Sequence, residues 1–165
     1  MMDTSARTKT NKTQTALEPS RFPNLLASID MGSNSFRLEI AELHKGKYKR
    51  IDYLKETVRL GAGLDDHGLL TEEATQRGLA CLARFAQRLK GFAPWQVRAV
   101  ATQTLREARN RDAFLQRGDL VLGHPIEIIA GREEARLTVR AAPGLSRRYQ
   151  FSRFGLVSQV IYCPK

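Results

Sequence analysis

The residue pattern best suited to chemistry is the motif DMGSNSFRL, residues 30–38, in which small polar residues follow a short apolar run. A tight turn of small residues can direct successive backbone N–H groups at phosphate oxygens. Asp30, at the end of the apolar run, can hold Mg²⁺ through water. The pattern therefore suits phosphoryl chemistry, and it equally fits an Asx-type hairpin turn that binds no ligand. The turn residues are Gly32, Ser33, Asn34 and Ser35.

A second candidate is the segment TQTLREARN, residues 102–110, which directly follows the apolar run at 97–101. A helix that begins where a strand ends directs its N–H groups and positive dipole end toward the carboxyl end of the sheet, which suits anions. Arg106 and Arg109 can add charge-assisted hydrogen bonds. Taken alone, the favoured interpretation is that both are solvated surface arginines.

The third candidate is the carboxylate pair Glu133 and Glu134 in GREEAR. Two carboxylates at a helix start are most simply surface residues stabilised by the helix dipole. The alternative is that one of them is a general base that activates water against a phosphoryl group. That role requires the carboxylate to face the same cleft as the turn that follows Asp30.

Other residue types that often carry chemistry receive no role. His44, His67 and His124 lie in turn-like segments without metal-ligand spacing. Cys81 and Cys163 form no CxxC pair, so neither a disulfide framework nor a zinc site is predicted, and a reducing compartment fits. Cys81 falls on the apolar face of a predicted helix, where we expect it to be buried.

Length and composition limit the class of protein. The chain has 165 residues, of which 42% are apolar and 27% are charged, enough for one domain with tails. No apolar run approaches the ~18 residues of a membrane-spanning helix, so we expect no membrane insertion and a cytoplasmic location. The net charge is +10, but residues 1–24 and 138–165 carry +2 and +5 of it. We therefore do not expect nucleic acid as a partner.

The periodicity predicts an α/β layout in the order βββ-α-β-α-β-α. Thr71 is the predicted N-cap of the first helix, which runs to about Lys90. The Gly- and Asp-rich segment 59–70 is a predicted loop, and a helix over 102–117 is expected to break near Asn110. The predicted strands are 25–29, 36–43, 48–58, 97–101 and 126–129, with a further helix starting near 131.

The chain divides into three expected parts. Residues 1–24 are polar and predict a disordered leader, with organellar targeting as the lesser alternative. Residues 25–137 form the expected lobe. Residues 138–165 mix Pro, Gly, Ser and Arg without Asp or Glu and form an atypical basic tail, in which only 154–162 resembles a strand.

With these motifs in order, the sequence resembles the exopolyphosphatase / guanosine pentaphosphate phosphatase family. The resemblance implies a ribonuclease H-like lobe of the actin-like ATPase and sugar kinase type, a mixed sheet with flanking helices. It also implies hydrolysis of terminal phosphate from inorganic polyphosphate, with guanosine pentaphosphate as the alternative substrate. The matching segments are ASIDMGSNSFRLEIA (27–41), VRLGAGLDDHGLLTEEATQRGL (58–79), VATQTLREARN (100–110) and IEIIAGREEARL (126–137).

The resemblance assigns roles to particular positions. Glu134 matches the catalytic base, Asp30 matches the Mg²⁺ ligand, and the turn after Asp30 matches the first phosphate-binding loop. Arg106 matches the arginine that faces the substrate. Two further positions that line the cleft are Arg37 and Arg59. Mg²⁺ is the implied cofactor, and a homodimer is the implied assembly of full-length family members.

The sequence departs from the family after about Leu137, because no second phosphate loop of the type DIGGGST and no second lobe follow. We therefore expect a truncated or frameshifted member with little or no activity. Two alternatives stay open. One is a non-catalytic polyanion-binding module that uses Arg147 and Arg148, and the other is a fragment that folds poorly. The sequence does not decide between polyphosphate and guanosine pentaphosphate, or the oligomeric state.

Overall fold

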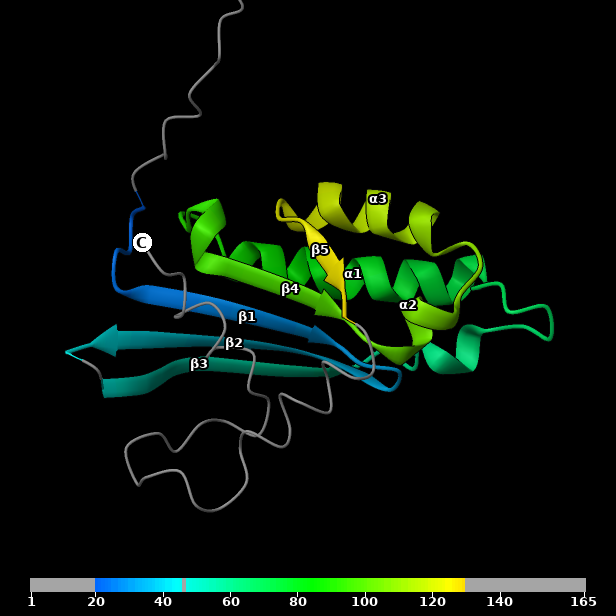
Figure 1. Ribbon diagram of the computed structural model, residues 1–165, viewed down its shortest axis with the longest axis horizontal. Coiled ribbons are helices and arrows are strands. Elements are labelled where there is room, and N and C mark those ends of the chain that lie inside the picture. The colour runs from blue at the N-terminus through cyan, green and yellow to red at the C-terminus, as the bar shows by residue number, and fades with distance from the viewer. Residues whose placement is uncertain (1–19, 46, 130–165) are drawn as a thin grey trace, which may run out of the picture.

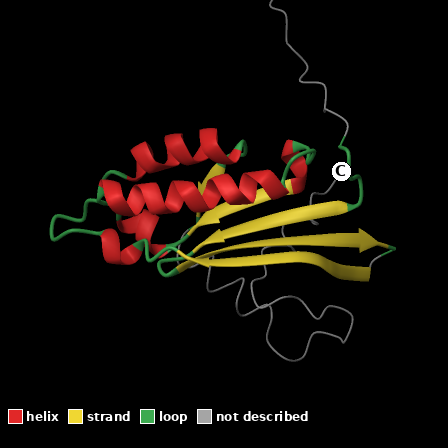
Figure 2. Ribbon diagram, turned by 180° about the vertical axis from the view of Figure 1, so that it is seen from behind, coloured by secondary structure: helices red, strands yellow, loops and turns green. Residues whose placement is uncertain are grey.

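A computed structural model describes residues 20–45 and 47–129 of the chain (Figure 1). A five-stranded sheet carries the described helices on one of its faces, which is visible from both sides of the molecule (Figure 2). The expectations for residues 1–19 and 130–165 lie outside the described residues. The elements are β1 (Leu25–Met31), β2 (Ser35–His44), β3 (Lys47–Thr57), η1 (Gly61–Gly63), α1 (Glu72–Arg88), η2 (Pro94–Gln96), β4 (Val97–Ala101), α2 (Gln103–Glu107), α3 (Arg111–Leu122) and β5 (Ile126–Ile128).

The sheet is mixed, with strand order β3-β2-β1-β4-β5. Short turns make β1, β2 and β3 an antiparallel meander, whereas β4 and β5 run parallel to β1. A parallel neighbour needs a crossover connection, which α1 supplies between β3 and β4, and α2 with α3 supply between β4 and β5. As a result, the carboxyl ends of β1, β4 and β5 lie together, and we call this place the carboxyl end of the sheet.

Helix α1 forms because its sequence is amphipathic and capped. The Thr71 side-chain oxygen accepts a hydrogen bond from the Ala74 N–H at 3.3 Å, as the sequence predicts for an N-cap. The buried face of α1 includes Leu82 and Phe85, which pack with Ile29 and Phe36 of the sheet in one hydrophobic core. The exposed Arg84 side chain donates to the Glu56 carboxylate on β3, which attaches the helix to the outermost strand.

The predicted elements agree closely with the structure. The three-stranded meander is confirmed, and the helix predicted over 102–117 is indeed broken, because α2 ends at Glu107 and α3 begins at Arg111. Cys81 is buried as expected, and burial together with the nearby Glu56 carboxylate raises the pKa of its thiol to about 12. None of the helices in the described residues is long and apolar enough to cross a membrane.

His124 gives the fold a pH dependence. It is buried, its Nδ1 has no hydrogen-bond partner in the described part of the chain, and burial lowers its pKa below the usual 6.5. The unfolded chain therefore takes up a proton at this residue near pH 6.5, whereas the folded chain does so only at a lower pH. We expect the melting temperature to fall between about pH 7 and pH 5. His124→Phe should remove this part of the decline, and an identical decline in the variant would show that other groups cause it.

Candidate active site

Three segments of the chain meet at the carboxyl end of the sheet. The end of β1 is joined to the segment after β4 because the N–H and the hydroxyl of Thr102 both donate to the Met31 carbonyl, each at 3.2 Å. The residue after β5 joins them through the Ile129 N–H, which donates to the Ala101 carbonyl at 3.1 Å. The first two motifs of the sequence analysis therefore lie side by side.

An ion pair marks the end of β1. Asp30 and Arg37 are cross-strand partners of β1 and β2, and Arg37 Nη1 lies 3.3 Å from Asp30 Oδ2. The Asp30 side chain is only 14% exposed and that of Arg37 is 26% exposed. Partial burial strengthens the interaction between such charges relative to bulk water. The pair thus places one carboxylate and one guanidinium beside the turn.

The turn is shorter than expected. Ser35 is the first residue of β2 and is buried, so the turn consists of residues 32–34. The Gly32 N–H donates to the Ser35 carbonyl at 3.2 Å and closes the hairpin, so in this structure that N–H faces the chain itself. The exposed Ser33 and Asn34 form the tip of the turn.

The segment that follows β3 is hydrogen-bonded to the tip of the turn. The Gly61 N–H donates to the Ser33 carbonyl at 2.8 Å, and the N–H groups of Val58 and Arg59 donate to the Asn34 carbonyl at 3.0 and 2.9 Å. In a trans peptide the N–H points opposite to the carbonyl of the same unit. The N–H groups of Asn34 and Ser35 therefore point away from the 58–61 segment, the orientation an anion-binding turn requires.

The two further arginines named by the sequence analysis have different settings. Arg59 is exposed and takes a positive φ of 52°, a backbone conformation that is uncommon for residues other than glycine. Its N–H is fixed on the turn, so this conformation belongs to the attachment of the 58–61 segment. Arg106 is half-buried, and its Nη1 donates to the Ile129 carbonyl at 3.1 Å.

The interpretation of both arginines of TQTLREARN as solvated surface residues is wrong for Arg106 and right for Arg109. Arg106 is held between α2 and the residue after β5, at the carboxyl end of the sheet. Arg109 is exposed. Sequence spacing alone did not distinguish them, because the difference arises from the break between α2 and α3.

A metal site made by protein side chains alone is not found in residues 20–45 and 47–129, where no group of three His, Cys, Asp or Glu is placed to hold an ion. Asp30 supplies a single, largely buried carboxylate. Mg²⁺ is commonly bound by one or two carboxylates together with water and substrate phosphates. The residues present therefore fit an Mg²⁺ ion that arrives with a phosphorylated substrate. Glu134, the expected base, lies outside the described residues.

Gly61 lies in the segment predicted as a loop, and the structure shows that a side chain there would be tightly packed. A Cβ at this position would lie 3.2 Å from both the Ser33 Cβ and the Thr104 Oγ1. The backbone of Gly61 therefore fills the space between the turn and α2. The Gly- and Asp-rich composition of the loop indicates a turn in the sequence. Only the fold shows that the turn after β1 and α2 lie against Gly61.

A mixed five-stranded sheet that begins with an antiparallel hairpin, continues into parallel strands and carries its helices on one face defines a ribonuclease H-like lobe of the actin-like class. Within that class, residues 39–147 match the Ppx/GppA phosphatase family, and the chain belongs to this family. The match begins just after the DMGSNSFRL motif and reaches past Leu137, the residue after which the sequence predicts a departure from the family.

The relatives are similar over part of their length. A guanosine-5'-triphosphate,3'-diphosphate pyrophosphatase of Vibrio vulnificus is 49% identical over 111 residues, which are 67% of this chain and 22% of the relative. A Ppx/GppA enzyme of Aquifex aeolicus superimposes with a TM-score of 0.65 at 33% identity, over 71% of this chain and 39% of that structure. An exopolyphosphatase of Cytophaga hutchinsonii gives a TM-score of 0.67 at 30% identity, over 71% and 38%. The chain thus spans between about a fifth and two fifths of these relatives.

Proposed function

We propose that this chain supplies the phosphate-binding lobe of a hydrolase that removes the terminal phosphate from inorganic polyphosphate. The observation that supports this most directly is the meeting of the Asp30–Arg37 pair, the turn and Arg106 at the carboxyl end of the sheet. Membership of the Ppx/GppA phosphatase family gives that arrangement its chemical class. The cytoplasmic location expected from the sequence belongs to the same proposal.

The described residues act on the substrate by binding it. The N–H groups of Asn34 and Ser35 hold oxygens of the terminal phosphate, and Arg106 neutralises charge on it from the side of β4. Arg37 and Arg59 add positive charge along the path of the bound polyphosphate. Several cations around one anion also draw it to the site by long-range attraction.

Mg²⁺, held by Asp30 and by the substrate, would polarise the phosphoryl oxygens when it is bound. Glu134 takes a proton from the attacking water. The water oxygen forms a bond to the terminal phosphorus while the bridging P–O bond breaks. The products are orthophosphate and a polyphosphate chain shorter by one unit.

Guanosine pentaphosphate is the second candidate substrate, because a relative named guanosine-5'-triphosphate,3'-diphosphate pyrophosphatase is 49% identical over 111 residues. Both substrates present a terminal phosphoanhydride, so the same turn and arginines would bind either of them. Phosphate release measured with each substrate, at equal concentrations of terminal phosphate, distinguishes the two candidates.

Arg106→Ala is the sharpest test of the binding site. We expect the variant to bind tripolyphosphate about tenfold or more weakly, because a half-buried guanidinium beside a phosphate makes a charge-assisted bond. Arg109→Ala is the matched control, since it removes the same charge three residues away at an exposed position. Titration calorimetry should show a small effect for the control.

Equal losses for Arg106→Ala and Arg109→Ala would overturn the proposed site and favour a polyanion-binding surface without a defined centre. Salt-dependent binding that is lost when Arg147 and Arg148 are replaced would locate that surface in the tail. Release of orthophosphate from polyphosphate with Mg²⁺, abolished by Glu134→Gln, would support the full hydrolytic reaction.

A further inference from the structure

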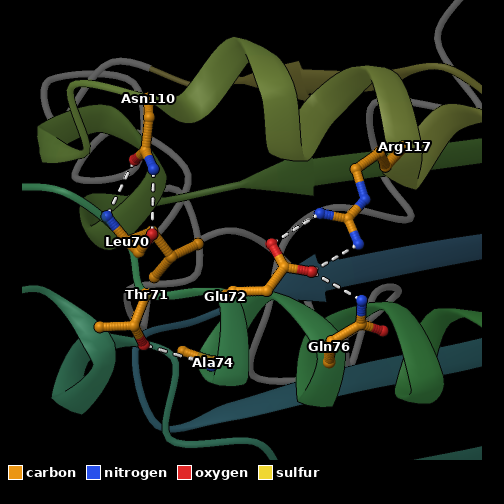
Figure 3. Close-up of polar contacts among 7 residues, drawn as sticks. All are labelled: Leu70, Thr71, Glu72, Ala74, Gln76, Asn110 and Arg117. Atoms are coloured by element: carbon orange, nitrogen blue, oxygen red, sulfur yellow. Dashed lines mark hydrogen bonds and ion pairs between the residues drawn. The ribbon is translucent and has the colours of Figure 1, made fainter.

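Asn110 makes an unusual use of its side chain. It precedes the first residue of α3, the position where an Asn side chain normally accepts a hydrogen bond from the first turn of the helix. Here no such capping bond is made. The amide binds the backbone of Leu70 instead, where its Oδ1 accepts from the Leu70 N–H at 2.8 Å and its Nδ2 donates to the Leu70 carbonyl at 2.9 Å (Figure 3). The capping of α3 is thus given up for a contact 40 residues away.

This contact attaches the α2–α3 junction to the loop before α1. A second bond strengthens it, because the Arg109 N–H donates to the Gly68 carbonyl at 2.9 Å. The two bonds to Leu70 imitate the pairing of a neighbouring strand, so they fix both the distance and the orientation of the segments. Arg106 lies four residues before Asn110 and is therefore fixed to the same loop.

From Leu70 the connection continues to the turn. Leu70 pairs with Leu64, and the Thr71 N–H donates to the Gly63 carbonyl at 2.9 Å. Two residues earlier, the Gly61 N–H donates to the Ser33 carbonyl at 2.8 Å. The loop that holds Asn110 at one end thus holds the tip of the candidate phosphate turn at the other.

The remaining connection passes through Thr102. Its N–H and hydroxyl bind the Met31 carbonyl, directly before the turn, and α2 with Arg106 follows it. The turn, the 58–71 segment, Asn110 and α2 therefore form a closed ring of chain segments joined by hydrogen bonds, which we call the site ring. Arg59, Arg106 and the turn are all members of the site ring. A closed ring restricts the relative positions of its members more than an open chain of contacts does.

We propose that Asn110 is a positioning residue that closes the site ring and thereby holds Arg106 at the distance from the turn that a bound phosphate chain needs. The proposal rests on the proposed function, because it assigns the anion to the turn and Arg106. Asn110 itself touches no substrate. Its effect on binding passes through α2, and without the amide the α2–α3 junction keeps the single Arg109–Gly68 hydrogen bond to the loop before α1.

The test compares Asn110→Ala with Arg117→Ala in the full chain. Arg117 is the matched control, because it makes two 2.9 Å bonds from α3 to Glu72 at the start of α1 and lies outside the site ring (Figure 3). Each variant loses two hydrogen bonds, those of Asn110 to Leu70 in the loop and those of Arg117 to Glu72 two residues further along the chain. We expect Asn110→Ala to weaken tripolyphosphate binding about tenfold, and Arg117→Ala to leave it nearly unchanged.

A double-mutant cycle shows whether Asn110 acts through Arg106. In an Arg106→Ala background, adding Asn110→Ala should cause little further loss of affinity, although it still lowers the melting temperature. An undiminished loss in that background, or equal affinities of Asn110→Ala and the wild-type chain, overturns the positioning role. Failure of the wild-type chain to bind tripolyphosphate instead overturns the proposed function itself.

Hydrogen exchange on the wild-type chain supplies a readout that needs no variant. Tripolyphosphate bound at the turn and Arg106 should slow exchange of the Leu70 and Arg109 amides, which belong to the site ring but do not contact the anion. Slowed exchange supports the site ring. Unchanged exchange of both amides in the presence of saturating tripolyphosphate contradicts it.

Discussion

Gly63→Ala is expected to lower the free energy of unfolding by about 3 kcal/mol, near the upper end of the cost of overpacking a core. Gly63 is buried in η1, and a Cβ there would lie 2.1 Å from the Ala74 Cβ and 3.3 Å from the Thr71 Oγ1. Neither neighbour can move easily. Ala74 is in the first turn of α1, and Thr71 both caps that helix and donates its N–H to the Gly63 carbonyl. Urea denaturation followed by circular dichroism measures the change.

Gly123→Ala separates this steric effect from the loss of a glycine as such. Gly123 has a φ of +76° at the end of α3, and a Cβ there meets nothing within 4 Å. Its replacement should cost about 1 kcal/mol through backbone strain alone. Similar losses at both positions would contradict the close packing of η1 against α1.

The elements of the fold could be predicted because local sequence determines them. Thr71 at the start of an amphipathic stretch predicted α1, and the alternation of apolar residues along 36–43 predicted β2. Strand ends shifted by one or two residues, since the ladder and not the composition decides where a strand stops. The carboxyl end of β1 is an example, because its pairing with β2 and β4 continues to Met31.

The candidate site could be predicted only in part. The sequence singles out Asp30 and the turn because their residue types form a contiguous motif. The attachment of the turn to the 58–61 segment and the role of Asn110 were not found, because each depends on contacts between segments far apart in the chain. A sequence shows Asn110 only as a helix-breaking residue, and its binding to Leu70 exists only once α1 and α3 are packed.

The balance of charge at the site leads to the second prediction. Asp30 is a carboxylate paired with Arg37, one of the arginines that are expected to bind an anion. A carboxylate next to a phosphate site weakens anion binding unless a cation stands between them. Asp30 should therefore oppose the bare anion and favour the Mg²⁺ complex, so its removal should act in opposite directions in the two conditions.

We expect Asp30→Ala to bind tripolyphosphate about fivefold more tightly than the wild-type chain when Mg²⁺ is absent, because a negative charge beside Arg37 is removed. With Mg²⁺ present, the wild-type chain should gain affinity and the variant should gain none, since the protein ligand for the ion is missing. Titration calorimetry with tripolyphosphate, with and without Mg²⁺, measures both changes.

Asp66→Ala is the control, because Asp66 is an exposed carboxylate on the 59–70 loop and its loss changes the net charge of the chain by the same amount. Mg²⁺ also binds tripolyphosphate in solution, and this effect is the same for Asp66→Ala and Asp30→Ala, so the comparison of the two variants removes it. If both variants gain equal affinity without Mg²⁺, the effect is one of net charge and Asp30 does not face the anion. If the Mg²⁺-dependent gain in affinity persists in Asp30→Ala, the ion is held by another group. Removal of the carboxylate that binds the ion would abolish the affinity that the ion adds.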